Sequence, residues 1–170
     1  MYLKYITSTL STDSGSQGVD LHERKETAMY PALNSRQEIH RWCRNFPGTK
    51  AHISEARRFV NSYLGDRPET YTAKLVTSEL ATNAIRHTRS GQAGGRFGVT
   101  LHAGTTLLIL AVHDEGGPNT PRRCQAENTD QNGRGLHLVE SLTTRWGVHG
   151  DDGGRTVWAL IPLDPAGQHA

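Results

Sequence analysis

The sequence predicts an α+β fold: a two-layer sandwich with a mixed, mostly antiparallel sheet of about four or five strands and about three helices on one face. Two observations favour this class. Two segments with apolar residues at helical spacing come first, and segments that alternate apolar and polar residues, or are continuously apolar, dominate the second half. Early helices followed by late strands are typical of an α+β architecture.

A first helix is predicted from residue 50 to residue 64. Thr49 is a suitable N-cap, and Gly65 provides a stop signal. The apolar face consists of Ile53, Ala56, Val60 and Leu64. Their spacing matches one side of a helix, so this segment should pack against a core.

A second helix is predicted from about residue 69 to residue 87. Its apolar face repeats at i, i+3, i+7 and i+11 through Ala73, Val76, Leu80 and Ala84. The loop RSGQAGG follows it. This helix therefore has one buried side and leaves its polar side chains for other uses.

The second half predicts mainly strands. Phe97, Val99 and Leu101 alternate with polar residues, and the run LLILAVHD follows after a short turn, so the two segments should form a hairpin whose second strand is buried. A short helix is expected over residues 136–144. A strand over residues 146–149, a DDGG turn and a last strand over residues 155–161 complete the fold.

The chain should contain one domain with tails. A length of 170 residues and 35% apolar content suit a single modest core. Residues 7–20 are rich in Ser, Thr, Gly and Asp, so burial there would not offset the entropy of ordering. The expected division is a tail over residues 1–35, the domain over residues 36–163 and a short tail over residues 164–170.

Composition argues against several classes of protein. The formal charge of +2 comes from scattered basic residues, so a nucleic-acid partner is not expected. Cys43 and Cys124 are too few and too far apart to suggest a disulfide framework or a zinc site. No apolar run approaches the roughly 18 residues that span a bilayer. A cytoplasmic protein without a membrane segment is expected.

One polar stripe on the second predicted helix is a candidate site. Glu79, Thr82, Asn83 and Arg86 lie at i, i+3, i+4 and i+7, so a carboxylate, an amide and a cation share one side of the helix. A solvated helix face is the commoner reason for such a stripe. The stripe indicates function only if other elements bring further site residues to it.

Two glycine-containing segments are candidates for that role. Asp114 ends an apolar strand just before Gly116, where a buried carboxylate needs a partner such as an adenine amino group, although D-x-G alone more often marks a turn. The segment NGRGL, with Gly133 and Gly135, precedes a helix whose free N–H groups favour a phosphate. No third glycine or G-x-x-x-x-G-K pattern occurs, which disfavours Rossmann and P-loop sites.

Taken together, these segments resemble the ATPase and kinase superfamily of gyrase, heat-shock chaperones, histidine kinases and mismatch-repair ATPases. SELATNAIRHT resembles its N box, VHDEGGP its first glycine box and NGRGLHLVESL its second, and the Gly154-Arg155-Thr156 segment resembles its closing element. The FPG, RWGV and GGRTVWALIP segments are most similar to actinomycete anti-sigma-factor serine kinases. The resemblance covers residues 44–163.

The resemblance implies a role for each matching residue. Asn83 would bind Mg²⁺, Arg86 would contact phosphate, and Glu79 would be the general base. Asp114 would accept a hydrogen bond from adenine, with Gly116 admitting the base and Thr156 supporting the contact. The remaining predicted site residues, which would line the phosphates, are Gly133, Arg134, Gly135 and Leu136.

The implied function is an ATP- and Mg²⁺-dependent serine/threonine protein kinase. It would bind a sigma factor, phosphorylate an anti-sigma-factor antagonist and so regulate transcription, and such kinases are commonly homodimers. Two alternatives remain open. The chain could be a nucleotide-binding interaction module without turnover, or an interaction protein that binds no nucleotide, which would require three ordered motifs to be accidental.

Overall fold

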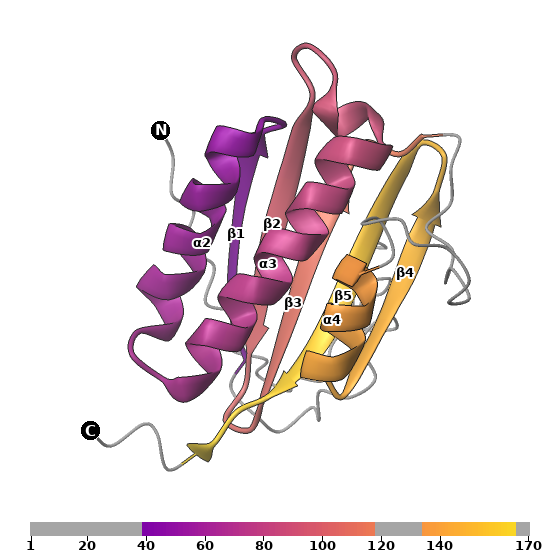
Figure 1. Cartoon of the computed structure of the whole chain (residues 1–170). Helices are drawn as coiled ribbons and strands as arrows, with labels where there is room; N and C mark the ends of the chain where they lie inside the picture. Colours follow the sequence, from indigo (N-terminus) through magenta and orange to yellow (C-terminus); the bar gives the residue numbers. More distant parts are fainter. Residues whose placement is uncertain (1–38, 118–133, 166–170) are drawn as a thin grey trace, which may run out of the picture.

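The computed structural model describes residues 39–117 and 134–165 of the chain, and these form a single five-stranded sheet with helices on one side (Figure 1). Every strand pairing is antiparallel, and the strand order is β1-β2-β3-β5-β4. The strands are β1 (His40–Pro47), β2 (Arg96–Ala103), β3 (Leu107–Asp114), β4 (Arg145–Asp151) and β5 (Gly154–Pro162).

Three α-helices lie side by side across one face of this sheet, as Figure 1 shows. They are α2 (Lys50–Leu64), α3 (Pro68–His87) and α4 (Arg134–Leu142), and the 3-10 turn η1 (Arg89–Gly91) follows α3. The helix α3 is the central one and contacts both α2 and α4. It is therefore the element to which the other parts of a site can be brought.

The core lies between the helices and the sheet. The predicted apolar face of α3 is buried in full, with Ala73, Val76, Leu80 and Ala84 at most 3% exposed. On β3 the helix-facing residues Leu108, Leu110 and Val112 belong to the same cluster. Asp114 follows these residues at the same two-residue spacing, so it also points to the helix side of the sheet.

The opposite face of β3 carries a different set of side chains. His113 lies there, and its two ring nitrogens are within 2.9 Å of Thr100 Oγ1 and 2.8 Å of Thr156 Oγ1. His102 lies on the same face one strand away and is 8% exposed. Burial, followed by the nearby charges of Arg41 and His113, lowers the pKa of His102 to about 4.

The predicted fold class is confirmed, with corrections of detail. Pairing is antiparallel throughout the described residues, so the parallel component implied by a mixed sheet is not found there. The strand β1 was missed because its polar and charged residues, such as Arg41 and Arg44, lie at a sheet edge and hide the alternation. Thr49 precedes α2 but makes no side-chain capping bond, and Thr49 Oγ1 lies 2.7 Å from His52 Nδ1 instead.

The element boundaries were predicted to within a few residues. The helix α2 ends at Leu64, and Gly65 follows with a positive φ of 65°. The predicted N-terminal tail over residues 1–35 lies outside the described residues, as do residues 166–170. Among the described helices, none is long and apolar enough to cross a membrane.

We expect acid to destabilise the fold through His102. Because burial lowers its folded-state pKa below the ordinary value of 6.5, the unfolded chain binds the proton first as the pH falls. The free energy of unfolding should therefore decrease between pH 6.5 and about 4, with His102 contributing up to about 3 kcal/mol. Urea unfolding at several pH values would measure this.

The variant His102→Gln should show a smaller decrease over the same pH range than the wild type. His149→Gln, on the exposed part of β4, is the control and should follow the wild-type curve. Parallel curves for His102→Gln and the wild type would show that His102 does not carry the effect.

Candidate functional site

The residues of the polar stripe predicted on α3 lie on a helix, and one of them, Glu79, contacts α4. Glu79, Thr82 and Asn83 are half-buried, and Arg86 is exposed in the last turn of α3. Thr82 is satisfied within its own helix, because its hydroxyl donates to the carbonyl of Ser78 at 2.6 Å. The groups that remain for a ligand are the carboxylate of Glu79, the amide of Asn83 and the guanidinium of Arg86.

The first turn of α4 lies directly against Glu79. A Cβ added at Gly135 would be only 2.5 Å from Glu79 Oε2, so the carboxylate of Glu79 lies directly against the backbone of α4 at this position. Leu136 is half-buried and packs on the core, which fixes this end of α4. Gly135 and Leu136 of the second glycine segment are thereby held beside Glu79, in the first turn of α4.

Gly133, of the second glycine segment, lies outside the described residues, as do residues 118–132 before it. Arg134 is the first residue of α4. The described residues therefore bring Glu79 and Gly135 together, with Asn83 one turn from Glu79 on α3 and Leu136 next to Gly135 on α4, and they leave Gly133 a prediction.

Asp114 is buried at the end of β3 and is 9% exposed. Its Oδ1 accepts a hydrogen bond from the backbone N–H of Gly116 at 2.7 Å. Burial raises the pKa of Asp114, while this bond and the positive charge of Arg155 oppose the increase. A carboxylate can accept further hydrogen bonds, so a ligand amino group could replace the solvation that Asp114 loses.

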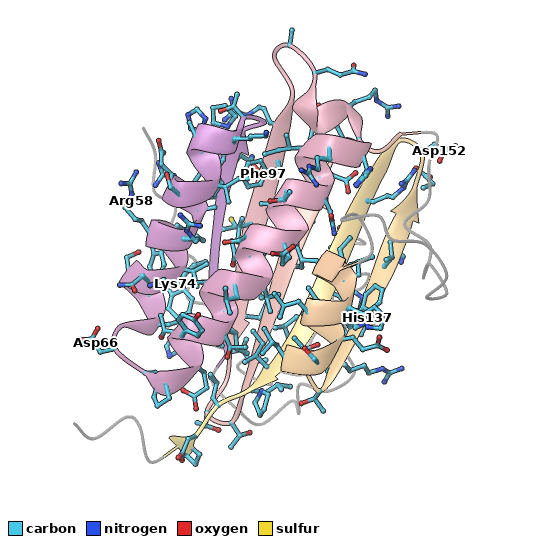
Figure 2. All side chains as sticks on the ribbon, viewed as in Figure 1. Arg58, Asp66, Lys74, Phe97, His137 and Asp152 are labelled. Carbon is cyan, nitrogen blue, oxygen red and sulfur yellow. The ribbon has the colours of Figure 1, made fainter. Side chains whose placement is uncertain are left out.

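The backbone around Gly116 gives a structural reason for glycine at this position. Its φ is +67°, and a Cβ there would lie 2.2 Å from the carbonyl oxygen of Asp152 in the turn between β4 and β5. Figure 2 labels Asp152, which lies at the tip of that hairpin. The absence of a side chain at position 116 thus allows the β4-β5 hairpin to approach the end of β3. The predicted role of Gly116 in admitting the adenine base stays a prediction.

Thr156 does not reach this group. The register pairs Asp114 with Arg155 and pairs His113 with Thr156. Side chains alternate along a strand, so Thr156 points to the far side of the sheet, where its hydroxyl is 2.8 Å from His113 Nδ1. In the structure, Thr156 therefore lies on the wrong side of the sheet for its predicted role beside Asp114.

Sequence reasoning missed Arg155, which is the residue that does lie beside Asp114. Arg155 is 3% exposed. A signal for it was present in the last strand: Val157, Ala159 and Ile161 alternate with more polar or exposed neighbours, and Arg155 is in phase with these three core residues. A buried charge at that phase needs partners, and Asp114 is on the adjacent strand.

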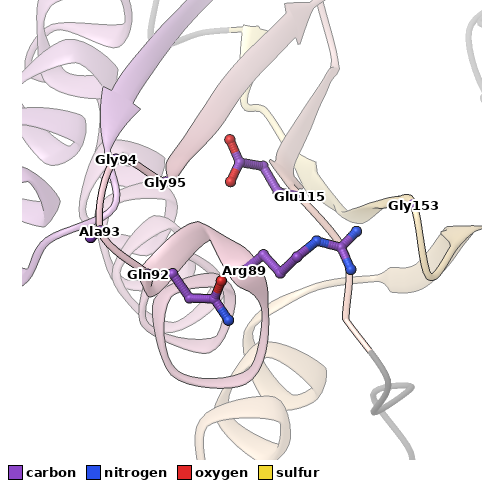
Figure 3. A pocket seen from close by; sticks show the side chains of 7 residues that line it. All are labelled: Arg89, Gln92, Ala93, Gly94, Gly95, Glu115 and Gly153. Carbon is purple, nitrogen blue, oxygen red and sulfur yellow. The ribbon is translucent and has the colours of Figure 1, made fainter.

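An open depression of about 410 Å³ lies nearby but is not the predicted site. Its lining comes from η1, from the turn that follows η1, from Glu115 and from Gly153 (Figure 3). None of Glu79, Asn83 or Asp114 lines it. The depression adjoins the first glycine segment at the end of the sheet, and the predicted residues instead lie between α3, α4 and the end of β3.

The described residues are compatible with Mg²⁺ held in part by a phosphate ligand. Within residues 39–117 and 134–165, no three His, Cys, Asp or Glu side chains form a metal-binding group. Such a group is unnecessary for Mg²⁺, which retains several waters and is commonly bound through one or two protein oxygens together with phosphates. The amide oxygen of Asn83, beside Glu79 on α3, is a suitable donor.

Comparison with known proteins gives one family match. The model of the histidine kinase-like ATPase domain matches residues 46–161. Among solved structures, a chain of the SiaB-SiaC complex from Pseudomonas aeruginosa has 18% sequence identity and a TM-score of 0.48, covering 86% of this chain and 100% of that chain. No curated protein sequence matches the chain.

Replacing Gly116 by Ala should destabilise the protein by about 2–4 kcal/mol, because the new Cβ adds a clash with Asp152 to the cost of a positive φ. Gly94→Ala is the matched control. Gly94 has φ +80° and no atom within 4 Å of an added Cβ, so it should cost only about 1 kcal/mol. Chemical denaturation of both variants measures the difference, and equal losses would contradict the assigned contact.

Proposed function

Because the chain belongs to the histidine kinase-like ATPase domain family, we propose that it is a Mg-ATP-binding regulatory serine/threonine protein kinase of the anti-sigma-factor type. In this proposal it binds a sigma factor and phosphorylates an antagonist protein in the cytoplasm, and so controls transcription through proteins without contacting nucleic acid. The motif resemblance of residues 44–163 supports this subgroup. A homodimer is part of the same proposal.

The observation that carries the proposal is the close approach of Gly135 to Glu79. It places the carboxylate of Glu79 at the first turn of α4, and Asn83 lies one turn further along α3. Free N–H groups and the helix dipole at an N-terminus favour phosphate, and a carboxylate beside them can act as a base. A fully solvated helix face would not have the first turn of another helix lying against its carboxylate.

The residues divide the work of phosphoryl transfer as follows. Asp114 accepts a hydrogen bond from the adenine amino group, and the amides of Gly135 and Leu136 donate to phosphate oxygens. Arg86 supplies positive charge at the end of α3, and the Asn83 amide oxygen holds Mg²⁺. When bound, Mg²⁺ neutralises charge on the phosphates.

Glu79 is the proposed base. Its carboxylate takes the proton of a serine hydroxyl while that oxygen forms a bond to the γ-phosphorus and the bond to the ADP oxygen breaks. The products are a phosphoserine and ADP, and the proton is on Glu79. The half-buried position of Glu79 beside α4 leaves it close to the phosphate-binding amides.

ATP with Mg²⁺ should bind the wild-type protein saturably in a calorimetric titration, and Asp114→Asn should weaken binding at least about tenfold. Asn keeps an oxygen for the Gly116 amide but presents N–H donors to the adenine amino group, so one hydrogen bond becomes a repulsion. Glu115→Gln, an exposed neighbour, should bind as the wild type does. Unchanged affinity in Asp114→Asn would remove the adenine contact from the proposal, and no binding by the wild type would leave a protein-interaction domain.

Glu79→Gln should keep ATP affinity within a few fold and lose about 10²-fold or more of phosphoryl transfer, because only the base is removed. Partners captured from the native host with ATP present serve as substrates, and labelled phosphate on protein is the measurement. Glu55→Gln, in a surface ion pair on α2, is the control and should transfer phosphate normally. Normal transfer by Glu79→Gln would contradict the role of Glu79.

A wild-type protein that binds ATP but transfers no phosphate to the captured partners would favour the alternative of a nucleotide-binding interaction module. In that case ATP should still change which partners are captured. Comparing capture with and without nucleotide therefore separates the two readings of the same site.

A further inference from the structure

Arg155 is a buried cation at the junction of three segments that surround Asp114. It is the strand partner of Asp114 and points to the helix side of the sheet. Its guanidinium donates to the carbonyl oxygen of Gly117 and to Asp152 Oδ1, the latter at 3.1 Å. The side chain of Arg155 is 2% exposed, whereas the side chain of Asp152 is 75% exposed. The ion pair alone therefore does not explain why the cation is buried.

A second arginine completes the junction from the side of η1. The backbone N–H of Arg89 donates to the carbonyl of Gly116 at 2.8 Å, and its guanidinium donates to the carbonyl of Asp152 at 2.6 Å. Figure 3 shows the side chain of Arg89 extending toward the hairpin turn that carries Gly153. The Gly116-Gly117 segment is thus bonded to η1 by its backbone and to β5 by Arg155.

Of the two arginines, only Arg155 is buried on the strand next to Asp114. Arg89 is exposed and reaches the turn from outside. A guanidinium is always charged and presents several donors in a fixed plane, so Arg155 can bind the carbonyl of Gly117 and at the same time act electrostatically on Asp114. Loss of Arg155 would release the glycine segment and remove a positive charge in one step.

We propose that Arg155 is a positioning residue for the nucleotide base: it fixes the Gly116-Gly117 segment and keeps the carboxylate of Asp114 available to accept a hydrogen bond from adenine. This inference rests on the proposed nucleotide site. It extends that site to a residue on β5 and to the turn between β4 and β5.

The charge of Arg155 matters because an acceptor carboxylate must be ionised. Burial raises the pKa of Asp114 and Arg155 opposes this, so removal of the cation should raise the pKa further. The charges that act on Asp114 are those of Arg155 on β5 and Arg89 on η1. The other charged or titratable side chains on the adjoining segments are Asp152 in the β4-β5 turn, Glu115 next to Asp114 in the chain, and Arg86 and His87 in the last turn of α3. Arg155 is the buried cation in this set.

The test is ATP affinity, with Mg²⁺, measured from pH 5 to pH 8 on Arg155→Gln, Arg155→Lys and the wild type. Arg155→Gln should lose about tenfold in affinity at neutral pH, as for loss of hydrogen bonds from a charged group. The pH below which affinity falls should also move upward, because Asp114 is protonated earlier. Arg155→Lys keeps the positive charge, so its ATP affinity should begin to fall at the same pH as that of the wild type. At neutral pH the affinity of Arg155→Lys should be about fivefold lower than that of the wild type.

Arg145→Gln, which removes an exposed arginine at the far end of β4, is the matched control and should leave both affinity and pH profile unchanged. Thermal unfolding of each variant checks the fold. If Arg155→Gln does not fold, Arg155→Lys still decides, since unchanged affinity at neutral pH would overturn the proposal.

Two further outcomes would also overturn it. In the first, Arg155→Gln keeps the affinity and the pH profile of the wild type. In the second, Arg155→Gln loses affinity by the same factor at every pH and Arg155→Lys loses as much, which is the result expected of a structural role. If the wild type binds no ATP, the proposed function fails first and this inference with it. If the wild type binds ATP and either of the two outcomes is found, only this inference fails.

Discussion

The antiparallel pairing of β3 with β5 is the constraint on which the candidate site depends. These two strands lie at the interior of the sheet, and their register decides which side chains share the helix side at the end of β3. It places Arg155 next to Asp114 and sends Thr156 to the other side. A shift of one residue would exchange these two neighbours and put a hydroxyl where a buried cation now lies.

Close approach by backbone is the second requirement of the site. Gly135 allows α4 to lie against Glu79, and Gly116 allows the β4-β5 turn to lie against the end of β3. A side chain at Gly116 would meet the backbone of the β4-β5 turn, whereas the atom nearest to Gly135 is the carboxylate oxygen of the Glu79 side chain.

Much of the fold could be predicted because periodicity survives wherever one side of an element is buried. The apolar faces of α2 and α3 were recognised in this way, and so was the hairpin of β2 and β3. The edge strand β1 was not, since charged residues such as Arg41 and Arg44 occupy it. The order of the short motifs along the chain was enough to predict that Glu79 and Gly135 lie together. The partner of Asp114 depends on strand register, and no short motif specifies that.

Acid sensitivity is divided between the two faces of one sheet. His102 and His113, both with lowered pKa values, belong to the face away from the helices, whereas Asp114 belongs to the helix face on the same strand as His113. Protons on the first face act on whether the chain stays folded, and a proton on the second acts on whether Asp114 can accept a hydrogen bond. His113 and Asp114, consecutive residues at the end of β3, thus take part in two separate responses to pH. A loss of ATP binding in acid reports on Asp114 alone only while His102 and His113 on the far face remain uncharged.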